Sequence, residues 1–350
     1  MSDLISQILL PLTLASFGLL ALLTLALVFE RLARNHRERQ AGERRRGYEY
    51  VLENGRDRRM RQLGKGAARH FPARCDLVDA LVLSGWKTGP VFAESDRLRS
   101  AAERDTTHGD VARRAVGVSL LAVIGGPEAV GLLVRLMRED PDVELRLIAA
   151  RSLRVIGDDA SARGLLGGLR DGVLPTARIV EQLGRPFAAH ALLDAIGDPE
   201  YASVRADIAE SLGLAGHVGA AGAIARLAST GDERERIKAC RALGRLADPV
   251  VVPLLIRALN DDAWAVRAQA ATALGACAHP SAVGPLATAL SDHNWWVRAN
   301  SANSLRRCGP AGLSALRDAA ENHPDRYARD RAIEALALEA ARSAPEAVAA

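Results

Sequence analysis

Apolar and polar positions along the chain follow a helical spacing in short segments separated by turn residues. Residues 282–290 and 295–307 both have this spacing, which is typical of one buried helix face. Between them, residues 291–294 read Ser-Asp-His-Asn, a turn with side chains suited to cap a helix N-terminus. Gly309 is expected to end the second helix. The pattern therefore predicts a pair of helices.

This pair recurs with a period of 31 residues. An arginine followed seven residues later by a leucine marks each unit, at Arg205/Leu212, Arg236/Leu243, Arg267/Leu274, Arg298/Leu305 and Arg329/Leu336. Arg146 and Leu153 have the same internal spacing after a change of phase. A fixed period of about 20–50 residues is the signature of stacked repeats. Because one helix pair cannot bury its own apolar face, the units are expected to stack.

The repeat core, Val-Arg-x-x-Ala-x-x-x-Leu-Gly, resembles HEAT repeats, particularly the short type also found in phycobilisome lyases. An aspartate lies six residues before the arginine in three units, at Asp140, Asp261 and Asp292. The resemblance covers residues 110–342, and it is weakest around 175–197, where Thr176 occupies the arginine position. It implies an all-α fold, a right-handed α-solenoid of about seven helix pairs.

In that family the aspartates and arginines form a ladder along the stack, which implies a structural role for them here. The ladder residues are Arg146, Arg205, Arg236, Arg267, Arg298, Arg329, Asp140, Asp261 and Asp292. Small residues four and three positions before each leucine, such as Ala270 and Ala271 or Ala332 and Ile333, are expected to let helices approach closely. The fold alone does not fix a function.

The N-terminal segment has a different composition. Residues 8–29 carry no charge, and as a helix these 22 residues would extend roughly 33 Å, enough for a bilayer core of about 30 Å. A cleaved signal peptide is the alternative, but the start MSDLISQ has no basic residue and VFERLARN offers no Ala-x-Ala cleavage site. We therefore predict one transmembrane helix within residues 5–29.

Charge around this segment predicts its orientation. Asp3 is the only charged side chain before it, whereas seven arginines follow it: Arg31, Arg34, Arg37, Arg39, Arg44, Arg45 and Arg46. The positive-inside rule places the N-terminus outside and the solenoid in the cytoplasm of a single-pass cell membrane protein. These arginines either bind anionic lipid of the inner leaflet or only fix the topology, and both remain open.

The excess of positive charge lies near the predicted span and not in the repeats. Residues 31–74 carry 14 basic and 5 acidic side chains, whereas residues 75–350 carry 32 and 35. A solenoid that binds nucleic acid would need positive charge along its length, so DNA or RNA binding is disfavoured. We assign a basic neck to 30–74, a divergent capping segment to 75–109, the repeats to 110–342 and a tail to 343–350. A flexible linker over 47–109 is the alternative.

Candidate chemistry is sparse. Cys75, Cys240, Cys277 and Cys308 form no Cys-x-x-Cys pair and are expected to be small buried residues in a reducing compartment. The histidines lack metal-binding spacing, and the Gly64-Lys65 pair lacks the serine or threonine of a phosphate-binding loop. No catalytic, metal or cofactor site is therefore predicted, and we expect a protein that is not an enzyme.

Three tryptophans are the candidate binding residues. Trp264 and Trp295 occupy the same position in consecutive repeats, and Trp296 adjoins the second. Tryptophan is enriched in binding hot spots, although these rings could instead pack against the preceding turn. We expect a membrane-anchored scaffold that binds a protein partner, itself membrane-associated. The alternative, which the resemblance implies, is a bilin lyase-like or chromophore-handling protein.

Overall fold

The computed structural model describes residues 42–43, 46, 48, 57–83 and 95–343. Every regular element within them is an α-helix or a short 3-10 helix, so the all-α prediction is confirmed for this part of the chain. The predicted span over residues 5–29 lies outside these residues, as do the neck arginines up to Arg45; Arg46 is exposed. None of the helices described here has the length and apolar character needed to cross a bilayer.

The described residues divide into two units. The first, which ends at Gly126, contains α2 (Asp57–Ala67), α3 (Phe71–Leu83), α4 (Asp96–Thr106) and α5 (Val111–Ile124). It therefore includes α5, which the sequence pattern assigned to the repeats. Helices α3 and α4 both bury leucines, such as Leu77 and Leu98.

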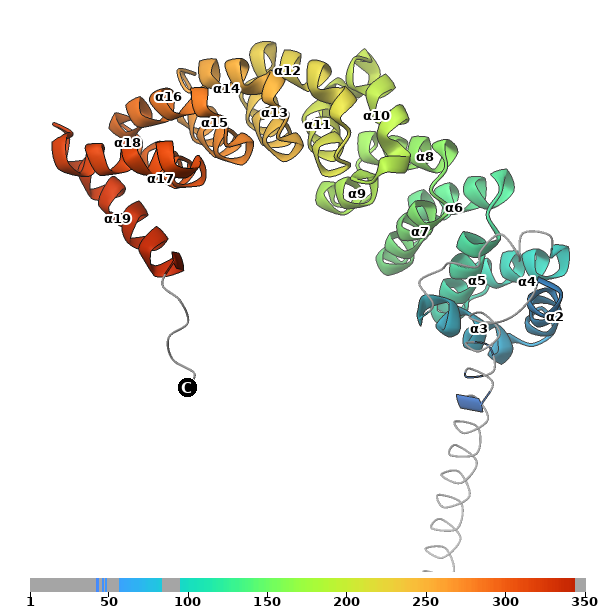
Figure 1. Cartoon of the computed structure of the whole chain (residues 1–350). Coiled ribbons are helices and arrows are strands. Elements are labelled where there is room, and N and C mark those ends of the chain that lie inside the picture. The colour runs from blue at the N-terminus through green and yellow to red at the C-terminus, as the bar shows by residue number, and fades with distance from the viewer. Residues whose placement is uncertain (1–41, 44–45, 47, 49–56, 84–94, 344–350) are drawn as a thin grey trace, which may run out of the picture. The chain divides into compact units, whose positions relative to one another are not determined.

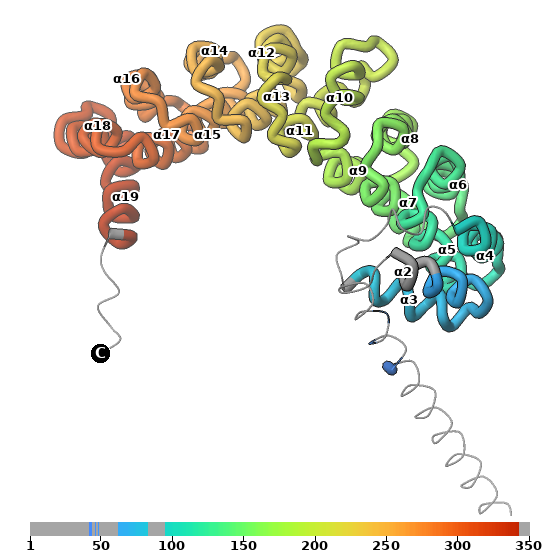
Figure 2. The backbone as a smooth tube through the Cα atoms, turned by 45° about the vertical axis from the view of Figure 1, so that its right-hand side comes forward, coloured from blue at the N-terminus to red at the C-terminus, as the bar shows by residue number. Residues whose placement is uncertain are grey.

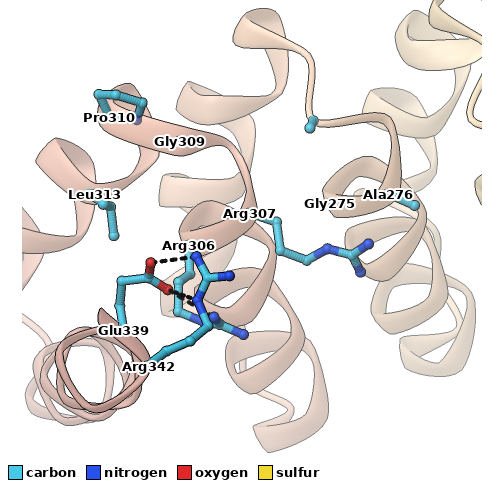
Figure 3. Close-up of a pocket in the computed structure, with 10 residues that line it drawn as sticks. Gly275, Ala276, Arg306, Arg307, Gly309, Pro310, Leu313, Glu339 and Arg342 are labelled. Atoms are coloured by element: carbon cyan, nitrogen blue, oxygen red, sulfur yellow. Dashed lines mark hydrogen bonds and ion pairs between the residues drawn. The ribbon is translucent and has the colours of Figure 1, made fainter. Parts of the chain in front are cut away.

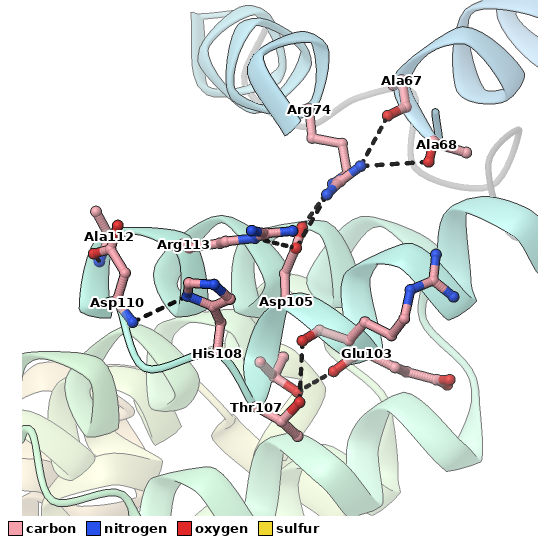
Figure 4. Close-up of polar contacts among 12 residues, drawn as sticks. Ala67, Ala68, Arg74, Glu103, Asp105, Thr107, His108, Asp110, Ala112 and Arg113 are labelled. Carbon is pink, nitrogen blue, oxygen red and sulfur yellow. Dashed lines mark hydrogen bonds and ion pairs between the residues drawn. The ribbon is translucent and has the colours of Figure 1, made fainter. Parts of the chain in front are cut away.

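A buried ion pair holds the first unit together (Figure 4). Asp105, only 1% exposed, accepts hydrogen bonds from Arg74 at 2.6 and 3.0 Å and from Arg113 at 2.8 Å. Both guanidinium groups also lie over the ring of Phe71. The sequence placed Arg74 in a basic neck. It lies instead inside α3 and joins α3 to α4, because a buried carboxylate requires a paired cation.

The second unit begins at Pro127 and contains seven helix pairs. The first helices of the pairs are α6 (Pro127–Glu139), α8 (Asp159–Arg170), α10 (Ala189–Ile196), α12 (Ala221–Thr230), α14 (Val252–Ala258), α16 (Val283–Thr288) and α18 (Gly309–Asn322). The second helices are α7 (Val143–Ile156), α9 (Thr176–Leu183), α11 (Arg205–Leu214), α13 (Glu233–Leu246), α15 (Trp264–Cys277), α17 (Trp295–Arg307) and α19 (Arg326–Ser343). Within this unit the even-numbered helices form an outer row and the odd-numbered ones an inner, concave row (Figures 1 and 2).

The sequence pattern explains most helix boundaries. Helix α17 covers the predicted residues 295–307, and Asn294 caps it by accepting the amide of Trp296 at 2.8 Å. Gly309, with a φ of +69°, reverses the chain after it as predicted. At the equivalent positions 31 and 62 residues earlier, Ala278 and Ala247 also have positive φ values, of 48° and 51°.

The predicted helix over residues 282–290 is wrong in its extent. A 3-10 turn at Pro280–Ala282 precedes α16, and a second one at Ala289–Ser291 follows it. Similar 3-10 turns precede α10, α12 and α14. The outer helices that follow a 3-10 turn, α10, α12, α14 and α16, are therefore short, with 6 to 10 residues, whereas the inner helices α13, α15 and α17 run for 13 or 14 residues.

The inner helices approach one another at glycines spaced 31 residues apart. A Cβ atom added to Gly213 would lie 2.6 Å from the Cα of Ala242, and one on Gly244 would lie 2.8 Å from the Cα of Ala273. The predicted small residues before each leucine are buried, Ala270 and Ala271 among them. Ile333 is the exception, because it is 54% exposed on α19.

Candidate functional site

The ladder arginines join consecutive repeats where an aspartate follows. Arg267 donates from Nε and Nη2 to the carboxylate of Asp292, at 2.7 and 3.0 Å. Its Nη1 donates to the backbone carbonyls of Asp261 and Asp262 at 2.8 and 3.0 Å. Asp292 also accepts the amide of Asn294 at 2.8 Å. One guanidinium therefore holds the turns of two neighbouring repeats.

Arg236 repeats this arrangement one unit earlier. It contacts Asp261 at 2.8 and 2.9 Å and the carbonyl of Gly231 at 3.0 Å. Burial alone would raise the pKa of Asp261, but the hydrogen bonds from Arg236 and from the Ala263 amide outweigh it, so the pKa lies below its ordinary value. The pKa of Asp292 is lowered against burial in the same way, by Arg267 and the Asn294 amide.

The other ladder arginines have different partners. Arg205 faces Glu235 at 3.4 Å, and Arg146 donates to the carbonyl of Val173 at 3.1 Å. Arg298 and Arg329 donate to backbone carbonyls of the turn before their own helix. Asp140, nearly buried, accepts the amide of Asp142 at 2.9 Å.

The sequence explains why Arg298 differs. His323 stands where the next aspartate would be, 31 residues after Asp292. Its Nδ1 accepts a hydrogen bond from the amide of Asp325 at 3.0 Å, just as Asp261 and Asp292 each accept one from the amide two residues later. Histidine has no carboxylate, however, to pair with Arg298. The Nε atom of Arg298 is buried without a hydrogen-bond partner, as is that of Arg146. Arg298 lies instead 5.2 Å from the ring centroid of Tyr327.

All three candidate tryptophans are exposed on the inner row. Trp264, Trp295 and Trp296 are 47%, 46% and 55% exposed, so they do not simply pack against the preceding turn. The ring centroids of Trp295 and Trp296 lie 4.6 Å apart, with the rings arranged edge to face. Arg331 of α19 lies 5.7 Å from the centroid of Trp295.

A shallow groove of about 100 Å³ extends from Trp295 between α17 and α19. Its walls include Asn303, Arg331, Glu334 and Leu338. Leu338 is 51% exposed and Tyr327, at the start of α19, 63% exposed. Apolar and charged side chains therefore lie side by side over two inner helices, a mixture typical of protein-binding surfaces.

A second group of charges, which the sequence patterns did not reveal, lies on α11 and α13. Asp207, 1% exposed, accepts a hydrogen bond from Arg234 at 2.6 Å and another from Lys238. Lys238 also contacts Glu210 at 3.0 Å. These side chains border a hollow of about 420 Å³. The one sequence feature that could have indicated this group is Lys238, one of only three lysines in the chain.

A third group borders a pocket of about 420 Å³ formed by α15, α17, α18 and α19 (Figure 3). Glu339 accepts hydrogen bonds from Arg306 at 2.9 Å and from Arg342 at 2.8 and 3.3 Å. The bonds from Arg342 and then from Arg306 lower the pKa of Glu339, which is therefore ionised at neutral pH. Arg307 reaches the same pocket.

The cysteines match their predicted role only in part. Cys240 is fully buried, and burial raises the pKa of its thiol to about 12. Cys75, Cys277 and Cys308 are half-buried and free, and burial also raises the pKa of each. Within the ranges that the structure describes, no group of three or more His, Cys, Asp or Glu residues could hold a metal ion.

The sequence and the fold are similar to those of known repeat proteins. Residues 189–264 and 252–337 match the family model for HEAT repeats. No curated protein matches the sequence. Among solved structures, human deoxyhypusine hydroxylase in complex with glycerol is 20% identical, with 74% of this chain and 99% of that chain covered and a TM-score of 0.31.

Two further solved structures are similar to this chain. The complex of CpcE and CpcF of phycocyanin lyase from Nostoc sp. is 23% identical over 69% of this chain and 94% of that chain, with a TM-score of 0.31. The karyopherin Kap121p bound to the extreme C-terminus of the protein phosphatase Cdc14p is 13% identical over 83% and 38%, with a TM-score of 0.49. The second unit of the protein is a solenoid of helix pairs, and its residues 189–337 match HEAT repeats.

Proposed function

We propose that the chain is a scaffold that binds other proteins through the inner row of its solenoid. The observation that carries this proposal is the exposure of Trp264, Trp295 and Trp296 on two adjacent inner helices. Tryptophan is enriched among the residues that contribute most to binding, and these cluster near the centre of protein interfaces. Stacked repeats offer a long surface on which such rings keep a fixed spacing.

We further propose that residues 5–29 anchor this scaffold in a membrane, with the solenoid in the cytoplasm. The uncharged run over residues 8–29 and the seven arginines after it support this arrangement. An anchor raises the effective concentration of the solenoid for partners in the same membrane, so a modest affinity suffices. The partner is therefore expected to be membrane-associated.

The test compares two exposed apolar side chains. Crosslinking of the full-length chain in native membranes, followed by mass spectrometry, identifies partners, and binding of the purified partner is then measured. Trp296→Ala should weaken binding about 30-fold, equivalent to about 2 kcal/mol, without lowering the melting temperature. Val250→Ala is the control, because Val250 is 81% exposed in the 3-10 turn that precedes α14 of the outer row.

Equal affinities of the wild-type chain and Trp296→Ala would contradict the proposal, as would equal losses in the two variants. Visible absorbance of a bound pigment in the purified protein would instead favour the chromophore-handling alternative.

A further inference from the structure

The pocket among α15, α17, α18 and α19 carries an excess of positive charge (Figure 3). Three arginines border it, Arg306, Arg307 and Arg342, against one carboxylate, Glu339. Arg306 and Arg342 share that carboxylate. Arg307 is exposed and has no hydrogen bond or ion pair to any residue that the structure describes. The pocket therefore has a formal charge of +2.

The end of a helix adds to this charge. Gly309 and Pro310, the first residues of α18, also line the pocket, and of the two only Gly309 has a backbone N–H. No side chain caps the N-terminus of this 14-residue helix. Uncapped amides at a helix N-terminus carry a partial positive charge and favour anions. Two independent features, the guanidinium groups and the helix end, therefore attract an anion.

The shape and walls of the pocket restrict the kind of anion. Its volume of about 420 Å³ falls within the range of small-molecule sites, about 300–1,000 Å³, and exceeds what a bare phosphate ion needs. Pro310, Leu313, Ala276 and Ala278 form apolar walls beside the arginines. An organic body would pack against these walls while an anionic group meets the guanidinium forks.

We propose that this pocket binds a small organic phosphate, with Arg307 and the remaining N–H groups of Arg306 and Arg342 donating to the phosphoryl oxygens. A phosphate dianion neutralises the excess of two positive charges, whereas a monocarboxylate neutralises one. The planar guanidinium group donates two parallel hydrogen bonds to phosphate, which gives strength and orientation. The ligand is either a soluble phosphate monoester or the monoester headgroup of phosphatidic acid.

Isothermal titration calorimetry on the full-length chain tests the proposal, with ADP and glycerol 3-phosphate as probes. Arg307→Ala should weaken binding about tenfold or more, because it removes a charge-assisted hydrogen bond to the phosphate. The fold should be unaffected, because Arg307 has no hydrogen bond or ion pair to any described residue. Arg317→Ala is the matched control, since Arg317 is exposed on α18 and does not line the pocket. It removes the same charge and should leave the affinity unchanged.

A third variant should act in the opposite direction. Glu339→Gln removes the competing carboxylate and frees two guanidinium groups, so binding should tighten several-fold. Binding to vesicles that contain phosphatidic acid would assign the site to a lipid headgroup, and binding of the soluble probes without binding to these vesicles would assign it to a soluble compound; either supports the pocket. Absence of binding by the wild-type chain, equal losses in Arg307→Ala and Arg317→Ala, or weaker binding by Glu339→Gln would overturn it.

Discussion

At the residue scale, the joints between repeats rest on single guanidinium groups that contact two turns at once. Arg267 is 17% exposed and its partner Asp292 12%, so water screens their interaction only in part. A charge-assisted hydrogen bond in such a site contributes about 1.5–3 kcal/mol, more than the pairs on the open surface. Among the ladder contacts, those that have both partners therefore contribute most to stability.

Arg267→Ala should consequently lower the stability of the protein by about 1–3 kcal/mol. It leaves the carboxylate of Asp292 partly buried and without its cation. Arg298→Ala is the internal comparison, because Arg298 contacts only backbone carbonyls and an aromatic ring, and its loss should cost less. Melting temperatures of the two full-length variants show which substitution costs more. Equal decreases would show that the carboxylate of Asp292 contributes nothing.

The same joints predict a dependence on acidity. The pKa values of Asp261 and Asp292 are lowered in the folded state from an ordinary value of 3.8. A lowered carboxyl pKa contributes stability that is complete above the unfolded value and is lost as the pH falls below it toward the folded pKa. Unfolding measured by circular dichroism should therefore show a steep loss below about pH 4. In Asp292→Asn this loss should be smaller; an unchanged profile would exclude Asp292 as its source.

At the scale of elements, glycines set the distance between inner helices. Gly244 of α13 faces the backbone of α15 so closely that a methyl group has no room. Gly244→Ala should therefore force the helices apart and cost about 1–3 kcal/mol. Gly284 of α16 has open space around it, so Gly284→Ala should instead stabilise the protein by up to about 1 kcal/mol. Thermal unfolding distinguishes the two signs, and a neutral Gly244→Ala would refute the close contact.

The inner helices were predictable from sequence because their apolar faces, caps and stops all lie within one repeat. For α17, Asn294 and Gly309 fix the two ends locally. The extent of the short outer helices was not predictable from the sequence. A 3-10 turn differs from an α-helix in its hydrogen-bond register, and the packing of neighbouring residues decides that register. The same applies to Ile333, whose exposure depends on where the array ends.

The candidate site was predictable only where residue type alone gave the signal. Tryptophans at matching positions of two repeats are visible in the sequence. The pocket around Glu339 is not, because it combines side chains from four helices and Arg306 lies 33 residues from its partner. Ordinary arginines in an arginine-rich chain give no pattern until the fold brings them together.

At the scale of the whole molecule, the proposed anchor predicts which side of a membrane the solenoid occupies. The seven arginines after residue 30 favour an N-terminus outside and a solenoid inside. Protease added to intact spheroplasts should therefore leave the solenoid whole, and detergent should make it cleavable. Digestion before detergent is added would reverse the orientation and remove the cytoplasmic scaffold proposal.

The replacement of an aspartate by His323 has a consequence for how the array comes apart. Arrays of repeats unfold from the joint with the lowest cost, since each unit contacts only its neighbours. The joint before the last helix pair lacks the carboxylate that Arg236 and Arg267 each have, so the detachment of α18 and α19 is opposed mainly by the ion pair between Arg306 and Glu339. The groove beside Trp295 lies across this same joint. A protein bound in this groove would contact both α17 and α19. Its binding would therefore raise the free energy needed to detach the last helix pair.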